Sequence, residues 1–368
     1  MKIALVHDWL TGMRGGEKAL ESLCELYPHA DLFTLIHRRG STSPPIERMR
    51  PRTSWLQHLP GIDHYYRRCL PLFPFVIEQF NLDGYDLVIS TSHCVAKSVV
   101  RPGRARHLCY CFTPMRYAWD QFDAYFGPER LGSIRSGLMR PLMAALARWD
   151  AQTSGRVDRY VAISQHVAQR IDRYYNRKAV VVYPPVDTTF YTPDNVARER
   201  WALMVTALVP YKKVDLAIDA CRRARVPLRI VGDGPERSTL ERRAAGSDVE
   251  FLGVRSDDDL RTLYRRCGAV MLPGEEDFGI VPVEAQACGR PVVALARGGA
   301  LETVVDGVTG VLIPEPTVEA FAEGVTSALS QDFDPVAIRL HALQFNRPRF
   351  AREIQACVMD MLHHAQTA

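Results

Sequence analysis

The sequence predicts two α/β halves, each built on a mostly parallel sheet with helices on both faces. Three observations support this prediction. The 368 residues exceed what one hydrophobic core usually supports, so two domains are expected. Short apolar runs alternate with amphipathic stretches, which is typical of strands joined by crossover helices. The alternation is interrupted at Pro184-Pro185 and then begins again.

The first half alternates strand-like and helix-like segments up to the proline pair. Its expected strands are residues 3–7, 32–36, 86–90, 107–111 and 159–163. Its expected helices are residues 17–26, 141–153 and 165–175.

The second half follows a polar stretch, residues 188–199. Its expected strands are residues 202–208, 228–231, 249–252, 269–272, 292–294 and 310–313. Its expected helices are residues 214–223, 235–245, 257–267, 281–288 and 318–329, and a last helix is expected at 349–364. We therefore predict domains at 1–185 and 186–345, with residues 346–368 as a C-terminal helix that packs back toward the first domain. Ligands bind such sheets at the carboxyl ends of strands, so the expected site is a cleft between the halves.

The composition excludes several classes of protein. An apolar fraction of 47% excludes a disordered chain. No apolar run approaches the ~18 residues that cross a bilayer, and the N-terminus enters a strand-like run directly, so no signal peptide is expected. The nine cysteines form no Cys-x-x-Cys pair, which argues against zinc ribbons and favours a reducing cytosol.

The charge is distributed unevenly. The net charge of +4 hides a balance of +9 in residues 1–185 and of −5 in the remainder. Such asymmetry suggests that the first half faces nucleic acid, anionic lipid or an anionic small molecule, and composition does not choose among them.

Gly15 and Gly16 lie between the first expected strand and the first expected helix. Paired glycines let a backbone approach a ligand, and a helix N-terminus attracts anions. The loop is neither a Walker A nor a G-x-G-x-x-G sequence. From this segment alone, it is either a phosphate contact or a tight turn.

An acidic loop, residues 273–285, follows a strand and leads into a helix. Glu276 lies ahead of the helix, and Glu284 lies about a turn inside it. Free backbone N–H groups at the helix start can hold a phosphate, and carboxylates accept hydrogen bonds from sugar hydroxyls. Alternatively, the acidic residues only stabilise the helix N-terminus.

Together, these motifs resemble those of the retaining glycosyltransferases of family 4, which have the GT-B fold of two doubly wound Rossmann-like domains facing a central cleft. The likeness covers nearly the whole chain. Glu276 and Glu284 match the E-x7-E motif, and further landmarks are residues 232–235 (GDGP), Ser164 and residues 183–187 (YPPVD). Residues 113–120 (TPMRYAWD) and 210–215 (PYKKVD) resemble a bacterial branch of O-antigen and exopolysaccharide mannosyltransferases.

The resemblance implies a nucleotide-diphospho-sugar donor, with GDP-mannose favoured, held mostly by the second domain. Glu276 would contact hydroxyls of the transferred sugar, and Glu284 would contact the donor ribose. Val254 would lie near the base. Glu276 and Lys212 are the residues expected to carry catalysis.

The resemblance also implies contacts to the diphosphate from both halves. Lys212 would be its main cation, helped by Lys213. Gly15 and Gly16 would close over it from the first half. The remaining contacts would be backbone amides at the helix start, around Phe278, Gly279 and Ile280.

Two positions depart from the family pattern. Many members carry an arginine where this chain has Ala207, and a histidine where it has Phe112. Phosphate neutralisation therefore falls more on Lys212, and a catalytic histidine at position 112 is in doubt. Retention needs no protein nucleophile if the leaving diphosphate takes the acceptor's proton. No Asp-x-Asp lies near a strand end apart from Asp257-Asp258-Asp259, which is expected at the surface, so neither a metal nor another cofactor is expected.

Residues 48–77 interleave arginines with aromatic residues, which suits an anionic membrane interface. The same mixture can bind single-stranded nucleic acid, or it can form a folded excursion over the first sheet. We predict that seven residues contact the membrane or the acceptor: Arg48, Arg50, Arg52, Trp55, Arg67, Arg68 and Arg116. The predicted partners are a polyprenyl-diphosphate-linked glycan acceptor and an anionic membrane surface, without nucleic acid.

The leading hypothesis is a transferase that moves a hexose, with mannose favoured, to a lipid-linked glycan in surface polysaccharide synthesis. It would act as a peripheral protein at the cytoplasmic face of the inner membrane. A nucleotide-sugar epimerase also uses two doubly wound halves, but the run at 276–284 together with Lys212 favours the transferase. A non-catalytic sugar- or nucleic-acid-binding protein is a third reading, prompted by Ala207 and Phe112.

Overall fold

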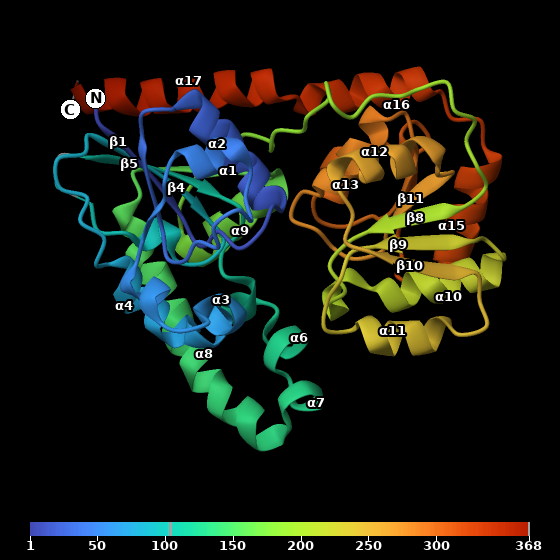
Figure 1. The fold of residues 1–368 in the computed structure, drawn as a ribbon, viewed down its shortest axis with the longest axis horizontal. Helices are drawn as coiled ribbons and strands as arrows, with labels where there is room; N and C mark the ends of the chain where they lie inside the picture. Colours follow the sequence, from blue (N-terminus) through green and yellow to red (C-terminus); the bar gives the residue numbers. More distant parts are fainter. Residues whose placement is uncertain (102, 104, 367–368) are drawn as a thin grey trace. The chain divides into compact units, whose positions relative to one another are not determined.

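The structure, a computed structural model, describes residues 1–101, 103 and 105–366. The chain forms two compact units. Unit 1 comprises Met1–Pro185 together with the chain from Phe350 onward, and unit 2 comprises Val186–Arg349. Each unit is built on one parallel sheet (Figure 1).

Unit 1 has a seven-stranded sheet of order β3-β2-β1-β4-β5-β6-β7. Its central strands are buried, which explains why they read as apolar runs in the sequence. They are β1 (Ile3–His7), β4 (Leu87–Ser92), β5 (Arg106–Cys111) and β6 (Arg159–Ala162). β2 (Asp31–Thr34) and the short edge strands β3 (Arg52–Thr53) and β7 (Ala179–Val181) complete the sheet. A strand of two residues, such as β3, has no periodicity that a sequence could reveal.

The longer helices of unit 1 cover the sheet, and short helical turns lie in the connections between β2 and β6. The longer ones are α1 (Gly15–Leu26), α8 (Ser133–Thr153) and α9 (Gln165–Tyr175). The helix expected at 141–153 therefore starts eight residues earlier, with Pro141 inside it. The shorter ones are α2 (Pro44–Arg48), η1 (Trp55–His58), α3 (Ile62–Tyr65), η2 (Tyr66–Leu72), α4 (Phe73–Ile77), η3 (Ala96–Ser98), α5 (Arg116–Trp119), α6 (Phe122–Phe126), α7 (Pro128–Leu131) and η4 (Ser154–Arg156).

Helix α9 begins at Ser164, one of the landmarks in the sequence. The Ser164 side chain accepts a hydrogen bond from the backbone N–H of Val167 at 3.0 Å. This is the standard N-cap contact, which satisfies one of the free donors of the first helical turn. The residue thus has a local structural role.

Unit 2 has a six-stranded sheet of order β10-β9-β8-β11-β12-β13. The strands are β8 (Ala202–Val205), β9 (Leu228–Val231), β10 (Val249–Gly253), β11 (Ala269–Leu272), β12 (Val292–Leu295) and β13 (Gly310–Ile313). The helices are η5 (Pro210–Lys212), α10 (Val214–Ala224), α11 (Arg237–Ala244), α12 (Asp257–Arg266), α13 (Ile280–Ala287), α14 (Ala300–Thr303), α15 (Val318–Ser330), α16 (Pro335–Ala342) and η6 (Leu343–Phe345). The carboxyl ends of β8, β9 and β11 lie side by side because these strands are neighbours.

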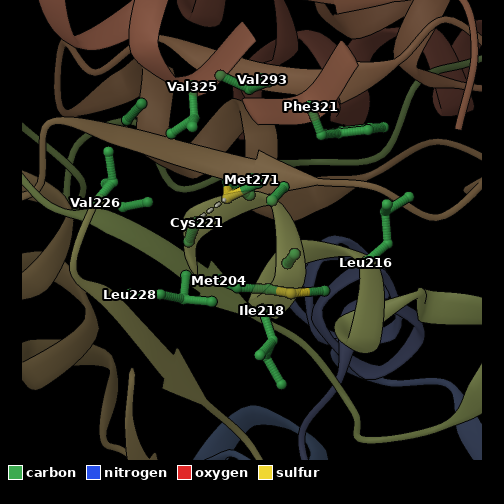
Figure 2. Close-up of a cluster of buried hydrophobic side chains, with 14 of the residues drawn as sticks. Met204, Leu216, Ile218, Cys221, Val226, Leu228, Met271, Val293, Phe321 and Val325 are labelled. Atoms are coloured by element: carbon green, nitrogen blue, oxygen red, sulfur yellow. Dashed lines mark hydrogen bonds between the residues drawn. The ribbon is translucent and has the colours of Figure 1, made fainter. Parts of the chain in front are cut away.

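The core of unit 2 lies between its sheet and helices α10 and α15 (Figure 2). Helix α10 buries Ile218 and Cys221, and α15 buries Phe321 and Val325. The Cys221 thiol lies 3.3 Å from the sulfur of Met271 on β11. Helix and sheet therefore share one apolar layer, which fixes the strand ends that carry the loops described next.

The last helix, α17 (Arg347–Gln366), continues from unit 2 into unit 1. Within unit 1, Phe350 is fully buried and packs edge-on against Tyr110 of β5 at a ring distance of 5.4 Å. Arg159 forms an ion pair with Asp360 of this helix. None of the described helices has the length and apolar character needed to cross a membrane.

Candidate functional site

In unit 2, two loops meet at the carboxyl ends of β8 and β11. Tyr211 and Lys212 follow β8, and Gly274 follows β11. A side chain at Gly274 would place its Cβ 2.5 Å from the carbonyl oxygen of Tyr211 and 2.9 Å from Cα of Lys212. Such distances are impossible for a real Cβ, so only glycine lets the two backbones touch here.

This contact brings together Lys212 and Glu276, the two residues expected to carry catalysis. The Lys212 ammonium group forms an ion pair with the Glu276 carboxylate. The two side chains are 15% and 14% exposed, so each charge is largely shielded from water. The pair joins residues that are 64 positions apart in the sequence.

Two further glycines, Gly298 and Gly299 in the loop after β12, contact the backbone of Glu276. The N–H of Gly299 donates to the carbonyl oxygen of Glu276 at 2.7 Å, and Gly298 pairs with Glu276 in a short parallel bridge. A Cβ on Gly299 would lie 2.5 Å from the carbonyl oxygen of Phe278. The loop after β12 therefore supports the acidic loop by direct backbone contact.

The start of helix α13 provides backbone donors beside Glu276. The helix begins at Ile280 after Gly279, whose φ of 88° is in the left-handed region that favours glycine. Phe278 is buried and packs on Phe345 at a ring distance of 5.5 Å. Phe278, Gly279 and Ile280 thus present main-chain groups at a helix N-terminus, an arrangement that suits an anion.

Glu284 is deeper than Glu276. It is 3% exposed, and its Oε2 accepts a hydrogen bond at 2.9 Å from the hydroxyl of Tyr264, which is fully buried. Burial and the Glu284 charge raise the pKa of Tyr264 well above its usual value, so the phenol stays a donor. Tyr264 therefore orients the carboxylate that the sequence assigns to the donor ribose.

Three other residues of unit 2 that the sequence analysis singled out are exposed. Lys213 adopts a left-handed conformation with φ of 54° just before α10, and its side chain is exposed. Val254 is 75% exposed directly after β10. Ala207 is exposed after β8 and supplies no charge. Lys213 is therefore not part of the Lys212–Glu276 ion pair.

In unit 1, the glycine loop opens helix α1 against an aromatic ring. A Cβ on Gly16 would lie 3.2 Å from the ring of Phe112, so Gly16 makes room for that ring. The buried Glu17 carboxylate accepts a hydrogen bond from the N–H of Arg14 at 3.1 Å, and burial raises its pKa to about 7. The N-terminus of α1 is therefore already capped by an acidic group.

Sequence reasoning missed Asp8, which is fully buried after β1. Its carboxylate accepts four backbone hydrogen bonds from residues 93–96 and contacts Nδ1 of His93 at 3.1 Å. The neighbouring His7 bonds Thr91 at 2.7 Å, and burial lowers the pKa of His7 to about 3. An acidic residue directly after a buried first strand was the available signal.

The predicted membrane or acceptor residues lie in unit 1, and six of the seven are exposed: Arg48, Arg50, Arg52, Trp55, Arg67 and Arg68. Arg52 also pairs with Asp31 at 2.8 Å, so it has a structural contact. Arg116 is half-buried at the start of α5.

The motif at 113–120 is anchored to two helices of unit 1. The Trp119 indole donates to Asp150 of α8 at 2.8 Å, and Asp120 pairs with Arg170 of α9 at 2.9 Å. These contacts hold α5, and hence Arg116, against the body of unit 1.

Unit 1 also has a surface hollow of about 480 Å³ lined by polar and basic residues of 37–63, among them Arg38, Arg39 and His58. Within the described parts of the chain, no group of three or more His, Cys, Asp or Glu residues could hold a metal ion.

Comparison with known proteins matches part of unit 2 to a family model. Residues 192–342 match the family model for glycosyl transferases group 1. A D-inositol 3-phosphate glycosyltransferase of a Mycobacterium species (strain JLS) is 32% identical over 219 residues, covering 53% of this chain and 49% of that protein. An uncharacterised glycosyltransferase of Methanocaldococcus jannaschii is 29% identical over 179 residues, covering 48% and 50%. The chain thus spans about half the length of the curated relatives it matches.

Solved structures are similar over the whole chain. The Anabaena protein HepE in complex with UDP-glucose has a TM-score of 0.72 at 20% identity, covering 98% of this chain and all of that one. A sucrose-phosphate synthase from Thermosynechococcus elongatus also reaches 0.72, at 17% identity, covering 99% and 100%. Residues 192–342 thus match the glycosyl transferases group 1 family model, and the two parallel α/β sheets of the chain form the GT-B fold.

Proposed function

We propose that the protein is a retaining glycosyltransferase that moves a hexose from a nucleotide-diphospho-sugar to a lipid-linked glycan acceptor. The observation that carries this proposal is the Lys212–Glu276 ion pair beside the N-terminus of α13. A cation, a carboxylate and a helix N-terminus in one place match a sugar diphosphate, which needs positive partners for its phosphates and acceptors for its hydroxyls.

In this proposal, the bound donor separates the ion pair, so that Lys212 contacts the diphosphate and Glu276 contacts the sugar. The Lys212 ammonium turns to the diphosphate, where negative charge grows as the bond to the sugar breaks. Glu276 then accepts hydrogen bonds from sugar hydroxyls, and Glu284, held by Tyr264, accepts them from the ribose. Because Gly298 and Gly299 hold the main chain of Glu276, that main chain keeps its place when Lys212 moves.

The transfer step needs no protein nucleophile. The bond from the anomeric carbon to the diphosphate oxygen breaks, and the acceptor oxygen forms its bond on the same face. The acceptor's proton passes to the departing diphosphate, which gains that proton as it leaves. Lys212 and the amides of residues 278–280 stabilise the charge on the leaving group.

The donor in this proposal is GDP-mannose, as the resemblance of residues 113–120 and 210–215 favours. HepE, which shares the fold, was solved with UDP-glucose, so UDP-sugars belong in the same test. Thermal stabilisation by GDP-mannose, UDP-glucose, GDP and UDP identifies the nucleotide. Product analysis with polyprenyl-diphosphate-linked saccharides then tests transfer.

Lys212→Met and Glu276→Gln should each lower transfer at least about a hundredfold, because each removes a group that acts on the reacting sugar diphosphate. Lys178→Met is the control and should change little, because this side chain is 89% exposed in unit 1, outside the proposed site. Turnover unaffected by Glu276→Gln would refute the assignment. A donor that is isomerised without any acceptor would instead indicate an epimerase.

The membrane proposal rests on exposed arginines beside exposed apolar side chains. Arg48, Arg50, Arg67 and Arg68 are exposed, and Phe75 is 62% exposed nearby in the sequence. Changing these four arginines to serine should abolish sedimentation with anionic liposomes, since each lysine or arginine near such a surface contributes ~1 kcal/mol.

A control removes the same charge from exposed arginines of unit 2: Arg200, Arg242, Arg255 and Arg297. Their change to serine should leave sedimentation intact. Equal sedimentation of both variants and the native chain would refute a membrane role for the four arginines of unit 1.

A further inference from the structure

His93 lies at the carboxyl end of β4, beside the end of β1. The two strands are paired in parallel, with His7 opposite Thr91. Asp8 follows His7, so the register places its carboxylate next to the chain that leaves β4. The sequence separates Asp8 and His93 by 85 positions, and only the sheet brings them together.

Asp8 holds the His93 backbone rigidly. Its Oδ2 accepts hydrogen bonds from the N–H groups of His93 and Cys94 at 2.7 and 3.0 Å. Its Oδ1 accepts those of Val95 and Ala96, both at 2.7 Å. The fully buried carboxylate of Asp8 thus accepts four hydrogen bonds and donates none, as an ionised carboxylate does.

This arrangement fixes which ring nitrogen of His93 carries the proton. Nδ1 lies 3.1 Å from Oδ2 of Asp8 in an ion-pair contact, and an acceptor-only carboxylate at that distance favours a proton on Nδ1. Burial lowers the pKa of His93, helped by the charges of Arg14, Arg116 and Arg67 and opposed by Asp8. The ring is therefore neutral near pH 7, and Nε2 carries a lone pair.

The His93 ring is partly exposed. The His93 side chain is 32% exposed, although Trp9 packs edge-on against the ring at 4.5 Å and Phe112 lies 6.4 Å away. Within the described parts of the chain, no hydrogen-bond partner of Nε2 is found, and the atom is not buried. A fixed, solvent-accessible acceptor is thus set among apolar rings at a strand end.

We propose that Nε2 of His93 accepts a hydrogen bond from a hydroxyl group of the acceptor saccharide, which makes His93 a substrate-contacting residue of unit 1. A neutral imidazole with a fixed tautomer accepts from a hydroxyl, whereas an arginine or lysine can only donate. The nearby charges of Arg14, Arg67 and Arg116 suit the diphosphate of the same acceptor. The inference rests on the proposed function, because it assumes that a saccharide acceptor binds unit 1.

Two substitutions separate substrate contact from a purely structural role. His93→Asn keeps an N–H close to Nδ1 for Asp8 but removes the acceptor at Nε2. His93→Gln reaches the Nε2 position with an amide oxygen but loses the contact to Asp8. A structural role predicts that asparagine preserves activity and glutamine does not, whereas a substrate contact predicts the reverse.

The assay measures transfer from the donor used by the native protein to polyprenyl-diphosphate-linked mono- and disaccharides. We expect His93→Asn to lower kcat/KM for the acceptor about tenfold, with the KM for the donor unchanged. His93→Gln should retain more activity than His93→Asn. His64→Asn, at a side chain that is 78% exposed, is the control and should match the native protein.

Thermal unfolding of each variant shows whether it is folded at the assay temperature. Native-like transfer by His93→Asn overturns the inference, and so does an equal loss in both His93 variants. Absence of transfer by the native protein to every saccharide acceptor refutes the proposed function itself. The two failures are therefore distinguishable.

Discussion

Replacing Tyr264 by phenylalanine tests whether its hydroxyl holds Glu284 in place. The substitution removes one oxygen atom and leaves the buried ring, so apolar packing is kept. What is lost is a 2.9 Å hydrogen bond from the hydroxyl to the carboxylate of Glu284, which is 3% exposed. Hydrogen bonds to charged groups contribute ~1.5–3 kcal/mol to stability, so we expect the free energy of unfolding to fall by about 2 kcal/mol.

Urea unfolding followed by hydrogen exchange in α12 and α13 measures this loss in unit 2 separately from unit 1. For a domain of this size, the change corresponds to a fall in Tm of roughly 4–8 °C. We also expect weaker donor binding, because Glu284 loses the group that orients it. Donor affinity is measured by calorimetry with the nucleotide sugar that stabilises the native protein.

Tyr191→Phe is the matched control. Its hydroxyl bonds Asp257 at 3.3 Å, a longer contact at the start of α12, and its ring is also buried. We expect a loss of only about 0.5 kcal/mol, the low end for any hydrogen bond, because this contact is long and Asp257 is exposed to water. If both variants unfold at the same urea concentration as the native protein, Tyr264 does not support Glu284 and the reasoning is wrong.

Three further predictions concern the support of the site and the stability of unit 1. Gly299→Ala forces the backbone near Phe278 to shift, so kcat/KM should fall by about a hundredfold in the transfer assay. Glu17→Gln should make the protein more stable at pH 8 by up to ~3 kcal/mol and change little at pH 4, as measured by urea unfolding. Ser164→Ala removes the N-cap of α9 and should cost about 1 kcal/mol of stability without changing donor affinity, measured by urea unfolding and calorimetry.

The pH dependence of stability expected for Glu17 follows from its raised pKa. Folding lifts the pKa from 4.5 to about 7, so the folded state binds the proton more tightly. The resulting stability is complete below pH 4.5 and is lost as the pH rises through 7. His7, whose pKa is lowered to about 3, changes the stability with pH in the opposite direction. Because His7 is present in both the native protein and the Glu17→Gln variant, its effect cancels when their stabilities are compared. A constant difference from pH 4 to pH 8 would contradict this account.

Controls for the other two predictions are available in the same chain. Gly155→Ala faces open space and should leave transfer unchanged, whereas a Gly299→Ala variant with native kinetics would show that the loop tolerates a side chain. Unaltered stability of Ser164→Ala would mean that the cap at 3.0 Å adds nothing.

The sequence by itself determined the fold class and most strands, because these depend on local periodicity. Buried parallel strands such as β1 and β4 have apolar residues on both faces and read as continuous runs. It also indicated that residues 210–215 and 273–285 follow neighbouring strand ends. It missed the edge strands β3 and β7 and the first turns of α8, because strands of two or three residues carry no period and the exposed start of α8 has no apolar stripe.

Only the tertiary structure decided which side chains meet. Lys212 and Glu276 are 64 positions apart, and their pairing depends on Gly274 and Gly299 letting three loops touch through their backbones. The contact between Asp8 and His93 depends on the register of β1 against β4. Such contacts follow from the order and register of strands and from close backbone packing, which act between distant residues and leave no periodic pattern along the chain.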